Sequence, residues 1–240
     1  MAAGEGFPFR SQNTFLKAPA GDGARPFAVA GLPWDGSVTN RPGARFGPDA
    51  IRRASHMLCD GTHPHFGVSP AGRLTDLGDL AFPNTSLAAM RSAVAAAIPP
   101  LLAKHHVVWL GGDHSVTLPV LRAMRERLGR PVALVHFDAH CDAWPDHLGE
   151  PSGHGTWTRE AIAEGLVVPQ ALIQLGIRSP AEREPREFVE KAGGRVFTAR
   201  ALRGLDGVPA LSPVIDEIRH RVVAAGSPPT YLTLDIDCLD

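Results

Sequence analysis

The stretch Val135-His136-Phe137-Asp138-Ala139-His140-Cys141-Asp142-Ala143-Trp144 begins as the end of an apolar run and then changes to residues that bind metals. The run before it, residues 132–138, is typical of a buried strand. In extended backbone, side chains two positions apart point to the same side, so Asp138, His140 and Asp142 are expected to project together. Two carboxylates and an imidazole on one face can bind a divalent cation. The alternative is a polar strand end that simply enters a loop, and this stretch alone does not decide between the two.

Short apolar runs alternate with helical patterns on both sides of this stretch. The expected strands are 27–32, 74–79, 107–110, 132–138, 171–176, 195–197 and 230–234, and the expected helices are 87–102, 116–128, 157–164, 181–191 and 212–224. A further helix is expected to begin at Pro48 and to turn Ile51 and Ala54 inward. The alternation is typical of βαβ units in a doubly wound, mainly parallel sheet flanked by helices. We expect an irregular arm over 1–26 and one α/β domain over 27–240.

Composition excludes several kinds of partner. The chain has 240 residues, is 44% hydrophobic and carries a net charge of −1 with no basic block, so nucleic acid and membrane surfaces are poor partners. Three widely spaced cysteines favour a reducing compartment over a disulfide framework. The first 26 residues lack the apolar segment of a signal peptide, and no apolar run approaches the ~20 residues of a membrane span. We expect a cytoplasmic protein.

Two other expected strands end in residues of the same chemistry as the first stretch. They run into Gly111-Gly112-Asp113-His114-Ser115 and into Asp235-Ile236-Asp237-Cys238-Leu239-Asp240. In a parallel sheet all C-terminal strand ends lie along one edge, so His114, Asp235 and Asp237 are expected to join the first cluster. The alternative for the glycine motif is a side chain that only caps the following helix.

Charge balance favours two metal ions over one at this edge. Two carboxylates about 4 Å apart repel each other by roughly 4 kcal/mol at an effective dielectric of 20. Two divalent ions contribute +4 against the −4 of the four aspartates, and a bridging hydroxide leaves the cluster at −1, which suits a cationic substrate. The oxygen-rich ligand set favours Mn²⁺ over Zn²⁺.

Other polar residues give weaker signals. Glycines on both sides of His154 predict a tight turn that holds this histidine, which is either functional or an ordinary hydrogen-bonded loop residue. Arg41 and Arg45 are expected to be solvated loop charges. Two pairs of histidines are expected at the surface: His63 with His65, and His105 with His106.

The three strand-end motifs resemble the signature motifs of the ureohydrolase (arginase/agmatinase) family. The resemblance extends from about Pro33 to the last residue. Four further segments look closest to agmatinases: 40–48, 134–138, 174–178 and 231–235. The motifs are highly specific for the family and less specific for the substrate. The resemblance implies an arginase-like α/β fold and a homo-oligomer.

The resemblance also implies a dimanganese hydrolase that cleaves a guanidinium group into urea and an amine. Six side chains would hold two Mn²⁺ ions, one by His114, Asp138, Asp142 and Asp235, and the other by His140, Asp138, Asp235 and Asp237, with Asp138 and Asp235 bridging. Asp142 would also orient the bridging hydroxide for attack on the guanidinium carbon, and His154 would shuttle a proton to the leaving amine. The small cationic substrate would be agmatine, giving putrescine and urea, or alternatively guanidinobutyrate, arginine or a related guanidino acid.

One departure from the family concerns the end of the chain. The family continues past the third motif into an eighth strand, between the third and the seventh, and places a substrate-orienting glutamate there. This chain stops at Asp240. We therefore expect unpaired strand edges and His114 separated from the other five ligands. A working enzyme known from part of its sequence and a catalytically inactive fragment that at most binds metal are both open. A dinuclear phosphoesterase is a weaker alternative, because the chain is near neutral and lacks a phosphate cradle.

Overall fold

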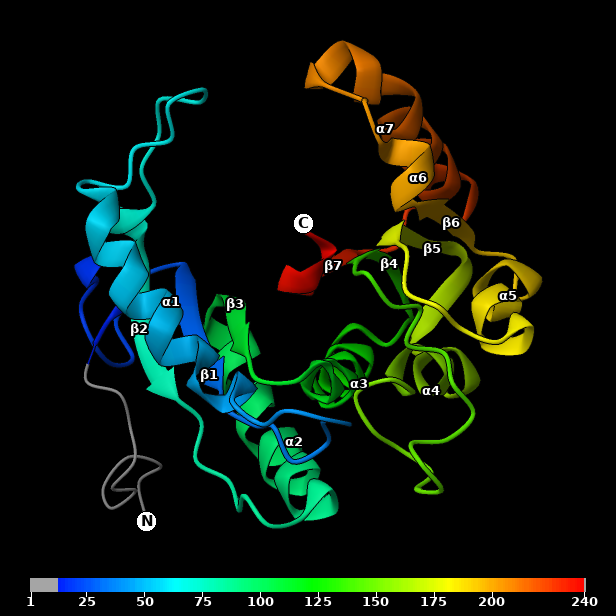
Figure 1. Ribbon diagram of the computed structural model, residues 1–240. Helices are drawn as coiled ribbons and strands as arrows, with labels where there is room; N and C mark the ends of the chain where they lie inside the picture. Colours follow the sequence, from blue (N-terminus) through cyan, green and yellow to red (C-terminus); the bar gives the residue numbers. More distant parts are fainter. Residues whose placement is uncertain (1–12, 240) are drawn as a thin grey trace. The chain divides into compact units, whose positions relative to one another are not determined.

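The computed structural model describes residues 13–239, which form two compact units divided between Val120 and Leu121 (Figure 1). Each unit has its own sheet, with strand order β2-β1-β3 in the first and β6-β5-β4-β7 in the second. Every pairing between these strands is parallel. The prediction of a parallel α/β fold flanked by helices is therefore confirmed, with the strands divided between two sheets.

The first unit is built around its central strand. The strands are β1 (Phe27–Leu32), β2 (Leu74–Asp79) and β3 (His106–Gly111), and the helices α1 (Gly47–Ser55) and α2 (Leu87–Lys104) both contact β3. One face of α2 is completely buried at helical spacing, through Met90, Val94 and Ile98. Of the arm predicted over 1–26, residues 1–12 lie outside the described residues, and the rest holds a single 3-10 turn, Phe15–Lys17.

Helix α2 runs further than expected. It was predicted to end at residue 102, but it continues through Pro99 and Pro100 to Lys104. Among the described residues it is the one helix that is long and apolar enough to cross a membrane, with 18 residues and a mean hydropathy of 1.2. Its buried face and its contact with β3 are those of a helix that covers a sheet.

Helix α1 turns a different face inward than the apolar pattern predicted. Ile51 and Ala54 are exposed, whereas Arg52 is fully buried. Arg52 donates from Nε and Nη2 to the two carboxylate oxygens of Asp76, at 2.9 and 3.0 Å, and from Nη1 to Asp79. The expectation for Ile51 and Ala54 was wrong because two buried carboxylates in β2 require the positive charge on that face.

Two residues predicted to be free at the surface are held by polar partners, and one of them, His105, is buried. Arg45 is not a solvated loop charge, because its Nε donates to Asp35, whose side chain is fully buried. His105 is only 6% exposed, and its two ring nitrogens contact the carbonyl oxygen of Arg25 at 2.8 Å and the carboxylate of Asp22 at 3.0 Å. In both cases a partner distant in sequence satisfies the polar group, which periodicity cannot reveal.

The second unit has helices on both faces of its sheet. The strands are β4 (Val132–Phe137), β5 (Val167–Ile177), β6 (Arg195–Thr198) and β7 (Thr230–Leu234), and the helices are α4 (Trp157–Ala163), α5 (Arg183–Lys191), α6 (Ala199–Leu202) and α7 (Gly207–Ala224). Helix α3 (Thr117–Leu128) spans the division between the units. On β6, Phe197 packs with Val214 of α7, and the neighbouring Val196 packs with Phe188 of α5. Successive residues of one strand thus face opposite helix layers, as a doubly wound sheet requires.

Four strands lie at sheet edges: β2 and β6, and also β3 and β7. Among the described strands, β3 pairs only with β1 and β7 pairs only with β4. Each has one backbone edge outside any described ladder. These are the two strands whose edges were expected to be unpaired without an eighth strand.

Candidate metal centre

The central carboxylates follow β4 in a loop and not in extended backbone. The strand ends at Phe137, the chain bends at Ala139 and His140, and Asp142 has a positive φ of 47°. Strand alternation therefore does not align Asp138, His140 and Asp142, as the sequence had suggested, because the chain leaves the sheet before the motif begins. The bend of the loop brings the residues together instead. The backbone N–H of His140 donates to the Asp138 side chain, with 2.6 Å between N and Oδ1.

Asp142 is fixed by the helix that follows the loop. Trp157, the first residue of α4, donates from Nε1 to Asp142 Oδ2 at 2.6 Å, and Thr158 N donates to the Asp142 carbonyl oxygen at 3.0 Å. The Asp142 side chain is buried, and an aspartate tolerates the left-handed conformation better than most residues. The start of α4 thus determines where this carboxylate points.

Asp138 is almost completely buried, and each of its carboxylate oxygens accepts a hydrogen bond. Oδ2 lies 2.8 Å from His136 Nε2, and Oδ1 accepts from His140 N. Each carboxylate oxygen has further lone pairs, so both oxygens can still take a cation. This is the arrangement that a bridging carboxylate needs.

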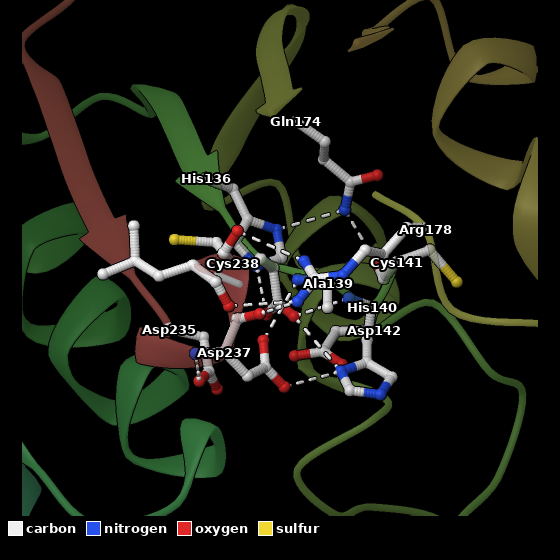
Figure 2. Close-up of polar contacts among 12 residues, drawn as sticks. His136, Ala139, His140, Cys141, Asp142, Gln174, Arg178, Asp235, Asp237 and Cys238 are labelled. Carbon is white, nitrogen blue, oxygen red and sulfur yellow. Dashed lines mark hydrogen bonds and ion pairs between the residues drawn. The ribbon is translucent and has the colours of Figure 1, made fainter. Parts of the chain in front are cut away.

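His136 was not singled out by the sequence. The register pairs it directly with Gln174 of β5, so both side chains lie on the same face of the sheet. Gln174 Nε2 lies 2.7 Å from the Cys141 carbonyl oxygen and 3.1 Å from His136 Nδ1 (Figure 2). The Cys141 carbonyl can only accept, so the amide nitrogen of Gln174 must face it and offers its second hydrogen to His136.

This arrangement assigns the tautomer of His136. Nδ1 accepts from Gln174, so Nε2 carries the proton and donates it to Asp138. His136, Asp138 and Asp142 offer ligand atoms within 4.8 Å of one another. His136 nevertheless acts as a donor to Asp138 and not as a ligand, because its Nε2 is protonated and Nδ1 is occupied.

The motif after β7 is joined to the same loop. Asp235 N donates to Phe137 O at 2.8 Å, and Asp235 Oδ1 accepts from Asp237 N at 3.1 Å at the start of the 3-10 turn Ile236–Cys238. Asp237 Oδ1 accepts from Ala139 N at 3.1 Å, and Asp237 Oδ2 lies 3.0 Å from His140 Nδ1. The structure thus brings Asp138, His140 and Asp237 together, with ligand atoms within 4.8 Å of one another.

A second residue missed by the sequence holds this turn. Arg178 follows β5, and its guanidinium donates to the carbonyl oxygens of Asp237 at 2.6 Å, Leu239 at 3.1 Å and Cys238 at 3.2 Å. Figure 2 shows it beside the turn that carries Asp235 and Asp237. Its position directly after a strand was the available signal, because the C-terminal strand ends form the site.

The electrostatics of this cluster favour a cation. The hydrogen bond with Asp138 and the charges of Asp237 and Asp142 raise the pKa of His140 to about 9, against the effect of burial. Burial, and then the charges of Asp235 and Asp138, raise the pKa of Asp237. The His140 shift reflects the carboxylates around the ring, and the Asp237 shift reflects burial first and neighbouring carboxylates second. A set of carboxylate oxygens with one imidazole therefore fits a divalent cation such as Mn²⁺.

His114 lies in the first unit, as the first residue of the 3-10 turn His114–Val116 after β3. The neighbouring Asp113 caps this turn, since Oδ1 accepts from Ser115 N at 3.0 Å and Oδ2 accepts from Ser37 N at 2.9 Å. Helix capping, the alternative given for the glycine motif, is therefore the role of Asp113. The metal-binding role of His114 stays a prediction.

His154 lies on a rigid loop before α4. Glu160 accepts from Ser152 Oγ at 2.7 Å and from Thr156 Oγ1 at 2.6 Å, and Gly153 N donates to Thr156 Oγ1 at 2.9 Å. His154 Nε2 is a buried atom with no hydrogen-bond partner among the described residues. The predicted tight turn is present, and the role of His154 in proton transfer stays a prediction.

Comparison with known proteins gives a consistent result. The model of the "Arginase family" matches residues 25–240. Agmatinase from Chromobacterium violaceum is 40% identical over 216 residues, covering 89% of this chain and 63% of that protein. Human mitochondrial guanidino acid hydrolase is 38% identical over 228 residues, covering 89% of this chain and 59% of that protein, so the chain spans about three fifths of these relatives.

The solved structure of proclavaminate amidino hydrolase from Streptomyces clavuligerus matches with a TM-score of 0.84 and 33% identity, covering 96% of this chain and 75% of that one. A hypothetical agmatinase from Burkholderia thailandensis matches with a TM-score of 0.82 and 32% identity, covering 95% and 69%. The strand-end motifs, the parallel sheets and the aspartate–histidine cluster therefore have one common explanation: the chain belongs to the arginase family.

Proposed function

We propose that this chain carries the metal centre and the proton-transfer residue of an amidinohydrolase that cleaves agmatine to urea and putrescine. The observation that carries the proposal is the cluster of Asp138, His140 and Asp237, whose ligand atoms lie within 4.8 Å of one another. The carboxylates around His140 also raise its pKa to about 9. Relatives named agmatinase and guanidino acid hydrolase, at 38–40% identity, support hydrolysis of a guanidino compound.

Two Mn²⁺ ions are the proposed cofactor. The residues that would hold them are His114, Asp138, His140, Asp142, Asp235 and Asp237. When bound, the ions make a nucleophile from water and polarise the group that is attacked. Support comes from the oxygen-rich donor set and from Asp138, which offers ligand atoms both beside Asp142 and beside His140 and Asp237.

The chain's own residues would orient and protonate the reactants. Asp142, whose Oδ2 is fixed by Trp157, would orient the attacking water. His154, with a buried Nε2 that has no partner among the described residues, would give a proton to the leaving amine. The negative charge of the cluster would attract the cationic guanidinium group.

A guanidino acid is the second candidate substrate. Human guanidino acid hydrolase and guanidinopropionase from Pseudomonas aeruginosa are each 38% identical to this chain, close to the 40% of the agmatinase. The strand-end motifs do not separate these substrates. A substrate's second charged group, an amine or a carboxylate, would make the distinction.

The test is urea release by the purified 240-residue chain with Mn²⁺. Agmatine, guanidinobutyrate, guanidinopropionate and arginine are compared at equal concentration, with Asp237→Asn as the inactive control. The proposal expects agmatine to give the fastest release. No urea from any of the four would overturn it. Mn²⁺ binding without turnover would instead favour an inactive metal-binding chain.

We also infer a cytoplasmic homo-oligomer. Support for the oligomer is the family relationship, and support for the compartment is that none of the three cysteines forms a disulfide. Analytical sedimentation of the purified chain tests the oligomer. The mass of a single chain at every concentration would contradict it.

A further inference from the structure

We propose that His147 is a positioning residue that holds the imidazole of His154, and that Gly153 leaves the space that this contact needs. The inference rests on the proposed function, in which His154 moves a proton. His147 belongs to none of the strand-end motifs and lies in the loop between β4 and α4, before the His154 turn.

A tight hairpin fixes the backbone of His147. His147 N donates to Glu150 O at 2.6 Å, and Glu150 N donates back to His147 O at 3.0 Å. Both central residues, Leu148 and Gly149, have positive φ, at 54° and 91°, and Asp146 Oδ1 accepts from Gly149 N at 2.8 Å. Positive φ at both central positions is the geometry of a two-residue hairpin turn, so His147 is held where the hairpin begins.

The two imidazoles meet edge to face. The ring centroids of His147 and His154 are 5.4 Å apart, and the ring planes cross at 77°. This separation and angle are those of a favourable aromatic pair. Rotation of the His154 ring would break the contact. The pair therefore restricts the orientation of the imidazole that is proposed to carry the proton.

Gly153 is required by this packing and not by its own backbone. Its φ lies outside the left-handed region, so another residue could adopt its conformation. A Cβ at this position would come within 2.7 Å of His147 Cβ and would overlap Cγ and Nδ1 of the ring. These atoms lie close to the His147 backbone, which the hairpin fixes, so the ring cannot move aside cheaply. An alanine at position 153 would displace His147.

At the Nε2 end of the His154 ring, orientation depends on packing and not on a hydrogen bond. The loop backbone is held through Ser152, Thr156 and Glu160, as described above. That network does not reach His154 Nε2, which is buried without a partner among the described residues. A nitrogen without a hydrogen bond cannot set the direction of its own ring. The contact with His147 can, and it does not occupy Nε2.

The experiment is a kinetic cycle with Mn²⁺ and the best substrate of the panel. His147→Ala and Gly153→Ala are each expected to lower kcat about tenfold with KM changed less than twofold, because a misdirected proton donor slows chemistry without weakening binding. The double variant is expected to lose no more than either single variant. His147→Phe, which keeps a ring, is expected to retain at least half of kcat.

A second cycle tests whether His147 acts through His154. His154→Ala is expected to lower kcat about a hundredfold. Adding His147→Ala to it is expected to change kcat less than twofold. The matched control is His63→Ala. His63 lies on an exposed loop of the first unit, and its ring centroid is 4.7 Å from that of Phe66. This variant is expected to leave kcat unchanged. Additive losses in the two cycles, or an unchanged kcat in His147→Ala, would overturn the proposal.

A readout without turnover separates this inference from the proposed function. In protein labelled with ¹⁵N-histidine, the ring signals of His154 are expected to shift or broaden in His147→Ala and in Gly153→Ala, and to stay sharp in His63→Ala. Unchanged His154 signals in the first two variants would refute the positioning role. If those signals change while no guanidino compound is hydrolysed, the contact stands and the proposed function fails.

Discussion

Each unit has a cluster of charged side chains beside its sheet, and the two clusters differ in burial and in how their charge is balanced. In the first unit, the guanidinium of Arg52 bonds both oxygens of Asp76 and also Asp79, and all three side chains are nearly inaccessible. In the second, Asp138 and Asp237 share one imidazole, that of His140, which is 44% exposed.

The comparison shows how a structural cluster differs from a site. A buried carboxylate pair that is fully bonded to a guanidinium has no remaining need for a cation. Beside His140, the hydrogen bond with Asp138 and the neighbouring carboxylates raise the pKa of the imidazole, whereas the pKa of Asp237 is raised first by burial and then by Asp235 and Asp138. Similar residues at similar places in two parallel sheets thus serve stability in one unit and, we propose, metal binding in the other.

The largest expected effect comes from breaking the balanced cluster. Arg52→Met leaves Asp76 and Asp79 buried without a counterion, so we expect the free energy of unfolding to fall by about 3–5 kcal/mol in urea denaturation. The control is Arg53→Met on the same helix, where Arg53 is 64% exposed and pairs only with Asp49, with an expected change below about 0.5 kcal/mol. If both substitutions lowered the free energy of unfolding equally, the buried ion pairs of Arg52 would contribute no more to stability than the exposed pair of Arg53.

A matched pair of substitutions tests metal binding and stability separately in the two clusters. Asp138→Asn is expected to weaken Mn²⁺ binding by about a hundredfold or more, because it removes the proposed bridging charge. Asp76→Asn is expected to leave Mn²⁺ affinity unchanged and to destabilise the metal-free protein more than Asp138→Asn does. Titration calorimetry gives the affinity, and urea denaturation in a chelator gives the stability. Loss of Mn²⁺ affinity in Asp76→Asn would contradict the distinction between the clusters.

A smaller effect should come from the residue behind the cluster. Gln174→Leu removes the donor that fixes the tautomer of His136, so we expect Mn²⁺ affinity to fall by about 10- to 100-fold, as when other outer partners of metal ligands are removed. Gln170→Leu, at an exposed position of the same strand, serves as the control. An unchanged affinity in Gln174→Leu would mean that His136 holds Asp138 without help.

The smallest effect concerns pH. The pKa of His140 is raised to about 9 in the metal-free protein, so its protonated form adds stability that is fully present below about pH 6.5 and is lost as pH rises through 9. Mn²⁺ must displace this proton, so its affinity should rise by about tenfold between pH 7 and pH 8. Calorimetry in buffers of different ionisation enthalpy measures the released proton. His140→Asn should flatten the pH dependence, and an unaltered slope in that variant would assign the proton elsewhere.

The sequence predicted the strands well because most of them are short apolar runs bounded by glycine, proline or polar residues. It identified Asp138, His140 and Asp237, which the structure brings together, because carboxylates and imidazoles at strand ends are recognisable locally. It failed for Arg52, whose inward position depends on Asp76, 24 residues away. It also failed for Asp142, whose positive φ takes it out of the alternation that extended backbone would give.

The amino-acid sequence by itself determined the fold class, the family and the ligand chemistry, since these follow from the order of apolar runs and the identity of side chains at their ends. The tertiary structure decided which carboxylates have their charge neutralised by a guanidinium and which do not. Strand register placed Gln174 against His136, 38 residues apart, and loop closure placed Gly153 under His147. Charge and packing act through space, so distances between remote residues, and not their order along the chain, distinguish a stabilising cluster from a reactive one.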